Sequence, residues 1–130
     1  MRQYTLVYPK RPWTLNIERA GNKWKRAALV KEWRAAFASL AREQGIPRLE
    51  QIEVIASPIL KNWAATPDTA ACIGAAKAAI DGLCDAGVLS EDGPKVVRKL
   101  TFLAPEVTPQ KVDALIIQIK ELEYAGEGQD

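Results

Sequence analysis

The chain contains no histidine and only two cysteines among its 130 residues. If Cys72 and Cys84 lie on one helix, their twelve-residue separation spans about 18 Å along its axis, which is too far for a disulfide. Two distant thiols and no imidazole exclude a structural zinc site and a Cys-His nucleophile within one chain. Any metal ion would therefore be held by oxygen ligands.

Long apolar runs are also missing. No run reaches the roughly 18 apolar residues of a membrane helix, and Pro9 and Pro12 interrupt the N-terminus before a signal-peptide core could form. We therefore expect a cytosolic protein with no membrane segment. Its hydrophobic content of 48% and charged content of 26% are typical of a globular protein. The length predicts one domain over residues 1–130, with 124–130 as a flexible polar tail.

The small net charge of +2 conceals two oppositely charged segments. Residues 1–34 hold nine Lys or Arg against two Glu, a net charge of +7. Residues 66–92 hold five acidic residues against Lys77, a net charge of −4. This polarity is expected where acidic, metal-binding side chains act on a polyanion that basic side chains hold.

The first half of the chain predicts a strand, a helix and a second strand. Aromatic and β-branched residues favour a strand over 3–8. Apolar residues at helical spacing predict an amphipathic helix from about residue 26 to a stop at Gly45. Alternating side chains then predict a strand over 51–57, which Pro58 closes.

The second half predicts another helix and another strand. Thr66-Pro67-Asp68 has the composition of a helix entry, and the helix is expected to continue through Ala86 to a stop at Gly87. Alternation predicts a strand over 95–103. The buried stripe of this helix is predicted to consist of Ile73, Ala76, Ile80 and Leu83.

For residues 110–122 the pattern leaves helix and strand open. Thr108-Pro109 would cap a helix, and apolar positions from Val112 to Ile119 fit its spacing. The consecutive apolar residues 115–117 equally fit a buried strand. Periodicity does not decide between the two.

Charged residues with a characteristic spacing surround the second helix. Asp68 precedes the segment Lys77-Ala-Ala-Ile-Asp81-Gly-Leu, and the acidic pair Glu91-Asp92 follows Ala86-Gly87. This pattern resembles the active-site core of RusA-type Holliday junction resolvases, particularly their phage and actinobacterial relatives. The segment from Arg11 to Asn16, with Arg19 beyond it, is similar to the N-terminal loop of that family. The resemblance spans roughly residues 4–122.

The resemblance implies a fold and an activity. The fold would be a small α+β domain with two main helices packed on a mixed four-stranded sheet, including a strand over 114–122. The activity would be that of an endodeoxyribonuclease, a homodimer that resolves Holliday junctions or related branched DNA by paired nicks. Mg²⁺ would be its cofactor, with Mn²⁺ as the alternative ion, and the setting would be a bacterial or phage-infected cytosol.

The resemblance also assigns roles to individual residues. Lys77 and Asp81 would be catalytic, since an ammonium suits a phosphate partner. Asp68, Asp92 and Glu91 would bind the metal ion, because Mg²⁺ prefers carboxylate oxygens. Basic and amide side chains near the N-terminus would contact the DNA backbone. These are Asn16, Arg19, Lys23, Lys25 and Arg26.

Two departures from the family pattern stand out. The family commonly carries D-x-D-N or D-x-x-N ahead of the lysine, whereas this chain has Asp68-Thr69-Ala70-Ala71. One early carboxylate therefore remains. At the acidic pair, Glu91-Asp92 replaces the usual two aspartates, which preserves the charge and lengthens one side chain.

Simpler interpretations remain open for the same residues. Lys77 and Asp81 have the spacing of an ordinary surface ion pair on a helix, worth about 0.2–0.5 kcal/mol. Asp68 has the position of an N-cap, and Glu91-Asp92 that of a turn. Clustered lysines and arginines also keep a helix face soluble.

The tryptophans and the function likewise have alternatives. Trp13 and Trp24 either stack on exposed bases or anchor their loop to the core, whereas Trp33 belongs to the core. The missing second early carboxylate, together with Ala71 and Ile73, favours a second hypothesis, a catalytically weak or inactive protein that binds DNA junctions. A third hypothesis is a protein-interaction module that uses its two charged segments for complementarity.

Overall fold

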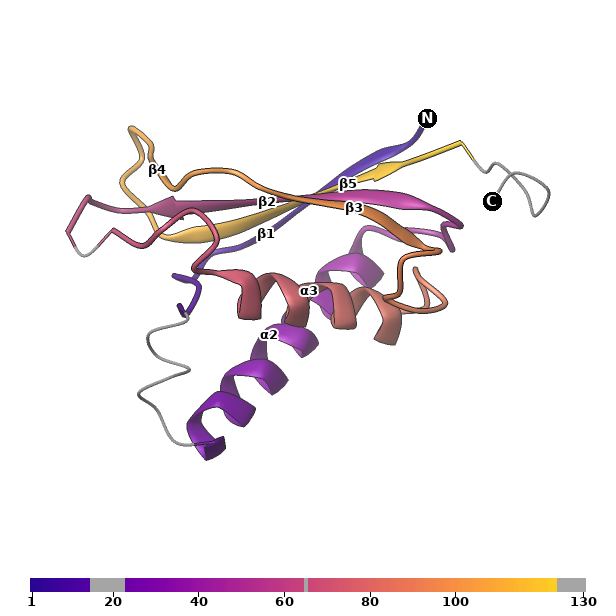
Figure 1. Cartoon of the computed structure of the whole chain (residues 1–130), viewed down its shortest axis with the longest axis horizontal. Helices are drawn as coiled ribbons and strands as arrows, with labels where there is room; N and C mark the ends of the chain where they lie inside the picture. Colours follow the sequence, from indigo (N-terminus) through magenta and orange to yellow (C-terminus); the bar gives the residue numbers. More distant parts are fainter. Residues whose placement is uncertain (15–22, 65, 124–130) are drawn as a thin grey trace.

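The computed structural model describes residues 1–14, 23–64 and 66–123. Two helices cover one face of a mixed sheet of five strands (Figure 1). This arrangement confirms the predicted α+β class, but the sheet has one strand more than the predicted four. In chain order the elements are β1 (Gln3–Tyr8), α2 (Lys23–Glu43), β2 (Ile52–Leu60), α3 (Ile73–Asp85), β3 (Val97–Phe102), β4 (Glu106–Val107) and β5 (Ala114–Glu121).

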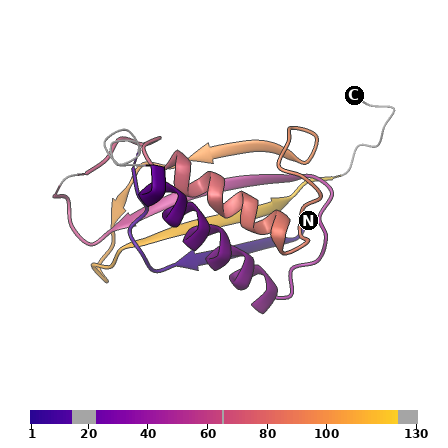
Figure 2. The ribbon, with the colours of Figure 1, turned by 90° about the horizontal axis from the view of Figure 1, so that it is seen from below.

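The sheet has the strand order β1-β5-β2-β3, and the short β4 pairs with the end of β2. Strand β5 runs antiparallel to both β1 and β2, while β2 runs parallel to β3 and β4. Both α2 and α3 therefore connect parallel strands, and such connections require a long crossover. From below, the two helices cross the sheet side by side (Figure 2).

Strand β5 resolves the ambiguity of residues 110–122. It lies between β1 and β2, and its side chains at Leu115, Ile117 and Ile119 are fully buried. Each of these residues pairs with a residue of β1 and one of β2. The central place in the sheet accounts for the consecutive apolar residues, and the strand interpretation is confirmed.

Pro58 does not end β2, contrary to the prediction. The strand continues to Leu60. Pro58 lies between two neighbouring ladders, because β3 pairs with β2 up to Ala56 and β4 begins its pairing at Ile59. At that interruption the missing N–H of proline removes no bond to the neighbouring strand on that side.

The start of α3 also differs from the prediction. Residues 68–72 form successive turns, in which Ala71 N–H donates to Asp68 O at 3.0 Å, and the helix begins at Ile73. Asp68 is therefore not its N-cap. The residues from 68 to 71 fit a helix by composition, but they are exposed or half-buried, whereas close packing begins at Cys72.

Ile73 is not part of the buried stripe of α3, which corrects a second prediction. Its side chain is 43% exposed, whereas Ala76, Ile80 and Leu83 are buried as predicted. Ile73 stands one and two turns before Lys77 and Asp81, so it shares their side of the helix. The buried side faces the sheet and α2.

An aromatic cluster joins β1, α2 and the segment after β1. The rings of Tyr8 and Trp33 meet edge to face with centroids 4.7 Å apart, and Trp13 meets Trp33 at 5.7 Å. Trp13 is only 4% exposed, so it anchors its segment to the core. The prediction that Trp33 belongs to the core is confirmed.

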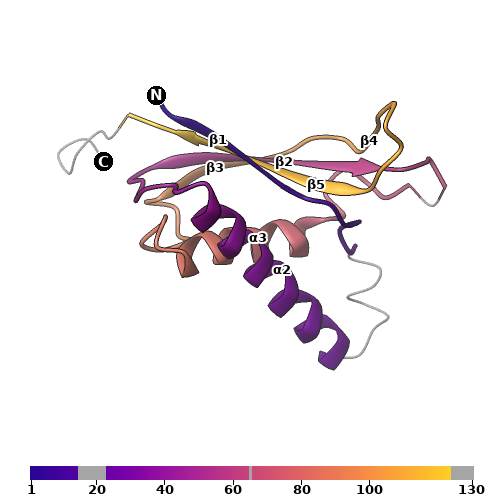
Figure 3. The ribbon, with the colours of Figure 1, turned by 180° about the vertical axis from the view of Figure 1, so that it is seen from behind.

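Seen from behind, the first turns of α2 project away from the sheet (Figure 3). The opposite face of the sheet is free of helices among the described residues. No helix in the described part of the chain is both long and apolar enough to span a membrane.

Candidate functional site

The exposed side of α3 carries the candidate site. Ile73, Lys77 and Asp81 follow one another at four-residue intervals, so they form one stripe along the helix. Cys84 continues this stripe and is half-buried. The remaining surface of α3 consists mainly of alanines that pack against the sheet and α2. Small side chains on the buried side and long charged ones outside orient this stripe toward solvent.

Lys77 connects two carboxylates that are far apart in the sequence. Its Nζ donates to Asp81 Oδ1 at 2.9 Å and also to Asp92 Oδ2. The first contact is the helical ion pair that the spacing predicts. The second brings the segment beyond α3 back onto the middle of the helix. Lys77, Asp81 and Asp92 thus form one cluster, called here the α3 charge cluster, and Lys77 and Asp92 within it are exposed.

The charges within the α3 charge cluster stabilise one another. Hydrogen bonds from Lys77 lower the pKa of the Asp92 carboxyl below its ordinary value. In return, the hydrogen bond to Asp92, followed by that to Asp81, raises the pKa of the Lys77 ammonium. At neutral pH the cluster therefore holds one cation and two anions. Its excess negative charge faces solvent.

The segment after α3 positions Asp92. Gly87, with φ of +80°, ends the helix in the left-handed conformation that glycine adopts at low cost. Val88 and Leu89 are buried, and Val88 O accepts a hydrogen bond from Leu49 N–H at 2.8 Å. Beyond Asp92, Gly93 O accepts bonds from the N–H groups that lead into β3. Asp92 is thus held between two fixed points.

Asp68 and Glu91 have different surroundings from Asp92. Asp68 is exposed and lies in the turns before α3, while Glu91 is exposed and its Oε1 lies over Gly93. Across the described residues, no three Asp, Glu, Cys or His side chains form a group that could hold a metal ion. The metal-binding roles of Asp68, Glu91 and Asp92 stay predictions. The two carboxylates that share the Lys77 ammonium are those of Asp81 and Asp92.

An ion pair between the helices extends the line of charges. Arg34 of α2 donates from Nε to Asp85 Oδ2 at 2.5 Å and from Nη2 to Oδ1 at 2.8 Å. Arg42 donates to the backbone oxygen of Asp85 at 3.1 Å. The Arg34 guanidinium lowers the pKa of the Asp85 carboxyl. Asp85 is exposed and at the same time links α3 to α2.

The charges of the α3 charge cluster affect the pKa of the nearby Cys84 thiol. Burial raises the pKa of its thiol, and the charges of Asp92 and Asp81 raise it further. Cys72 is buried, and burial raises its pKa as well. Both cysteines are free thiols, as their spacing predicts. A raised pKa leaves these thiols protonated and poorly nucleophilic at neutral pH.

The predicted DNA-binding residues fall into two groups. Lys23, Lys25 and Arg26 are exposed on the first turn of α2, which projects from the sheet. Lys23 lies about 16 Å along the axis of α2 from Arg34, the residue that binds Asp85 of α3. Asn16 and Arg19 lie outside the described residues. We call the first turn of α2, with Lys23, Lys25 and Arg26, the basic turn. The basic turn and the α3 charge cluster are thus on the two helices that cover the same face of the sheet.

Two tryptophans remain exposed. Trp24 on the basic turn is 75% exposed, and the Lys23 ammonium lies 5.5 Å from its ring centroid. Trp63, in the connection between β2 and α3, is 61% exposed. No sequence motif assigns a role to Trp63. Its position in the sequence between a predicted strand and a predicted helix is the one feature that could have indicated an exposed tryptophan.

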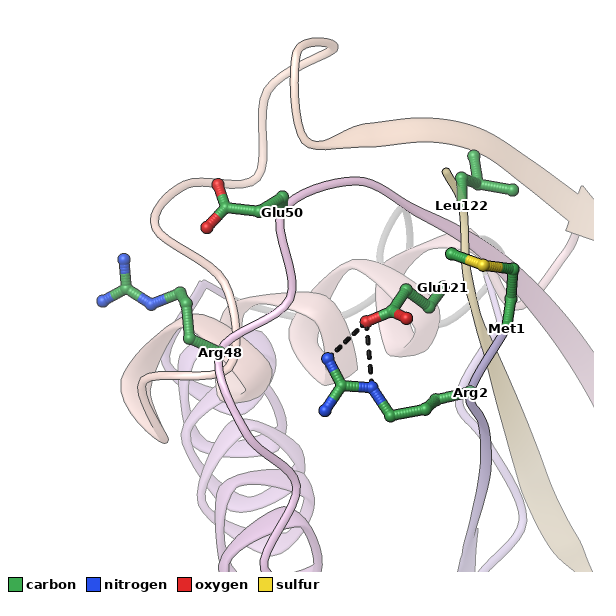
Figure 4. Close-up of a pocket in the computed structure, with 6 residues that line it drawn as sticks. All are labelled: Met1, Arg2, Arg48, Glu50, Glu121 and Leu122. Atoms are coloured by element: carbon green, nitrogen blue, oxygen red, sulfur yellow. Dashed lines mark hydrogen bonds and ion pairs between the residues drawn. The ribbon is translucent and has the colours of Figure 1, made fainter. Parts of the chain in front are cut away.

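A pocket with a different composition lies where the ends of β1 and β5 meet. Figure 4 shows the Arg2 guanidinium pointing at Glu121, and Arg2 Nη2 donates to Glu121 Oε2 at 2.6 Å. Arg48 donates from Nε to Gly87 O at 3.0 Å. The pocket is lined by none of the predicted site residues. Its lining residues are Met1, Arg2, Arg48, Glu50, Glu121 and Leu122.

No protein-family model matches this chain, and no curated protein matches it significantly. The functional interpretation of the α3 charge cluster and the basic turn therefore depends on their geometry and on the sequence pattern.

Proposed function

We propose that this protein is a Mg²⁺-dependent endodeoxyribonuclease that cuts Holliday junctions or related branched DNA. The observation that carries the proposal is the α3 charge cluster, in which Lys77 binds Asp81 and Asp92 at the solvent-exposed side of α3. In this cluster a lysine ammonium, a group suited to binding phosphate, lies beside two carboxylates. RusA-type resolvases are the family that its spacing resembles.

The donor set of the cluster fits a magnesium ion. Mg²⁺ in phosphate-processing sites is held by one or two carboxylates, with water and substrate oxygens filling the other positions. Asp81 and Asp92 supply two such carboxylates, and they already share one cation. When bound, the ion would polarise the phosphate and activate a water molecule for its hydrolysis.

Lys77 has the protonation state and the freedom that a phosphate partner needs. Its raised pKa keeps the amine protonated at neutral pH. Its ammonium lies on a flexible, exposed stem, so it can exchange one carboxylate for a phosphate oxygen. In this proposal Asp81 orients the Lys77 ammonium through the 2.9 Å hydrogen bond that Lys77 Nζ donates to it. Lys77 then neutralises charge on the scissile phosphate.

The basic turn would hold the DNA backbone while the α3 charge cluster acts on one phosphate. Lys23, Lys25 and Arg26 are exposed on a helix end that projects toward solvent. Contacts of this kind bind phosphates without regard to sequence. A homodimer would supply two such sites and thereby two nicks in opposite strands of a junction.

The experiment is cleavage of a synthetic four-way junction by the purified protein with Mg²⁺. The wild type should produce paired nicks, and Asp92→Asn should reduce the rate at least about a hundredfold, the order seen when one electrostatic group is removed from an active site. Glu50→Gln is the matched control, since it removes an exposed carboxylate from another surface. An uncut junction, or equal rates for wild type and Asp92→Asn, would disprove the nuclease.

A second candidate is a protein that binds branched DNA without cutting it. Ile73 favours this candidate, because an exposed apolar side chain occupies the stripe one turn before Lys77. No third carboxylate joins Asp81 and Asp92 among the described residues. Junction binding that weakens with salt, together with an uncut junction under Mg²⁺ or Mn²⁺, would establish this candidate instead.

A further inference from the structure

Trp63 exposes a large apolar ring in the connection between β2 and α3. Its side chain is 61% exposed, whereas Trp13 and Trp33 are buried. Single apolar residues are common on protein surfaces, so exposure alone indicates nothing. The backbone around Trp63, however, is held in place on both sides.

Hydrogen bonds define the turn that presents Trp63. Ala64 N–H donates to Asn62 Oδ1 at 3.0 Å, and Thr66 Oγ1 donates to the backbone oxygen of Trp63. Before the turn, Lys61 N–H donates to Asp113 Oδ1 at 2.9 Å. Asparagine and threonine side chains commonly stabilise turns in this way. The indole is therefore presented from a preformed turn, which lowers the entropy lost when it binds a ligand.

The neighbours of this turn suit a nucleic acid. The bond from Lys61 to Asp113 joins the turn to the connection between β4 and β5, which exposes Lys111 and Val112. Figures 1 and 3 show both connections at the end of the molecule toward which the first turn of α2 also lies. An aromatic ring accompanied by lysines is the combination that binds single-stranded nucleic acids.

We propose that Trp63 stacks on an unpaired base of the DNA, while Lys61 and Lys111 contact the adjoining phosphates. The inference rests on the DNA binding proposed above and identifies which feature of the substrate is recognised. A stacked indole accepts any base, since every base has an aromatic face. The Trp63 turn would therefore favour a branch point with unpaired bases over an uninterrupted duplex.

The experiment compares the affinities of three DNAs for the wild type, Trp63→Ala and Trp63→Phe in a metal-free, low-salt buffer. The DNAs are a four-way junction with unpaired bases at its branch point, a single-stranded oligothymidylate and a fully paired duplex. Fluorescence anisotropy of labelled DNA gives Kd without requiring cleavage. Trp63→Ala should weaken binding of the junction and the single strand about 5- to 150-fold and leave duplex binding within about twofold. Trp63→Phe should restore most of the loss.

Val7→Ala is the matched control, because Val7 is exposed on β1, in another part of the fold. It should leave all three affinities unchanged. A wild type that binds the DNAs, with Trp63→Ala unchanged or equally weakened for all three, would overturn the Trp63 proposal alone. A wild type that binds none of them would overturn the proposed DNA function together with it.

Discussion

Gly82 of α3 lies directly against the backbone of Arg34 in α2. A Cβ atom added to Gly82 would stand 2.4 Å from Arg34 O and 3.0 Å from Ala38 N. Backbone atoms cannot yield as the end of a flexible side chain can. The absence of a side chain at Gly82 thus allows the two helices to approach closely where Arg34 and Asp85 form their ion pair.

Gly82→Ala should destabilise the fold. The added methyl group forces the helices apart, and overpacking of this kind costs about 1–3 kcal/mol, offset in part by the better helix propensity of alanine. Urea denaturation followed by circular dichroism measures the free energy of unfolding. Ser39→Ala, at an exposed position of α2, is the control and should change little. An unchanged midpoint for Gly82→Ala would contradict the close approach.

Tyr8 should ionise unusually late. Its hydroxyl donates to Glu32 Oε2 at 2.6 Å, and this bond raises the tyrosine pKa to about 12. Because the pKa is higher in the folded state, the associated stability is complete below the ordinary tyrosine pKa of 10.0 and is lost as the pH rises toward about 12. Ultraviolet absorbance of tyrosinate measures the titration.

Glu32→Gln tests the cause of that shift. It removes the carboxylate that Tyr8 and Lys10 share, so the Tyr8 pKa should fall back toward 10.0. Tyr8→Phe removes the titrating hydroxyl, so loss of the late titration in this variant assigns it to Tyr8. If Glu32→Gln left the late titration in place, the hydrogen bond would not be its main cause.

Lys77→Gln should raise the pKa of Asp92. The hydrogen bond from Lys77 is the largest cause of the lowered value, and it is absent in the variant. Carboxyl chemical shifts followed by NMR during acid titration report the change. Lys99→Gln is the control, because Lys99 pairs with Glu53 at 3.5 Å and does not touch Asp92.

The same pair predicts how stability depends on pH. A pKa lowered by folding contributes stability above the ordinary aspartate pKa of 3.8, and this stability is lost as the pH falls through the pKa of the folded state. The pair is exposed, so its contribution should be about 0.2–1 kcal/mol. Lys77→Gln should therefore be less stable than the wild type at neutral pH, and the difference should shrink in acid. A constant difference would argue against the ion pair.

Ile73→Asp should strengthen metal binding at the α3 charge cluster. The new carboxylate would lie one turn before Lys77 on the exposed side of α3. Added ligand charge favours Mg²⁺, and we expect a gain in affinity on the order of tenfold. Calorimetric titration with Mg²⁺ measures it. Ile73→Asn is the control of equal size without charge, and equal affinities for the two variants would rule out the stripe as a metal site.

Neutralising the basic turn should reduce the salt dependence of DNA binding. Each phosphate contact contributes about −0.9 to the slope of log K against log salt concentration, so Lys23→Gln, Lys25→Gln and Arg26→Gln together should reduce its magnitude by up to about 2.7. Anisotropy titrations with junction DNA at several salt concentrations give the slope. Lys99→Gln combined with Lys120→Gln removes cations from the sheet instead. An equal reduction in that control would remove the special role of α2.

Local pattern predicted most of the elements. Apolar spacing located α2, alternation located β3, and the pairing of Lys77 with Asp81 follows from helical geometry alone. These predictions succeeded because each depends on residues within one or two turns or a few strand positions. The metal and DNA roles assigned to such residues came from resemblance and remain predictions.

Contacts between distant segments decided the rest. Residues 114–121 form a strand because β1 and β2 offer pairing on both sides. Helix α3 starts at Ile73 because close packing begins only at Cys72, whereas residues 68–70 are exposed. Asp92 meets Lys77 only because Gly87, Val88 and Leu89 turn the chain back along α3. Residue types and spacing established which side chains could form the α3 charge cluster. That Asp92 joins Lys77 and Asp81 depends on the folded chain, since burial and hydrogen bonding of the segments around Asp92 set its position.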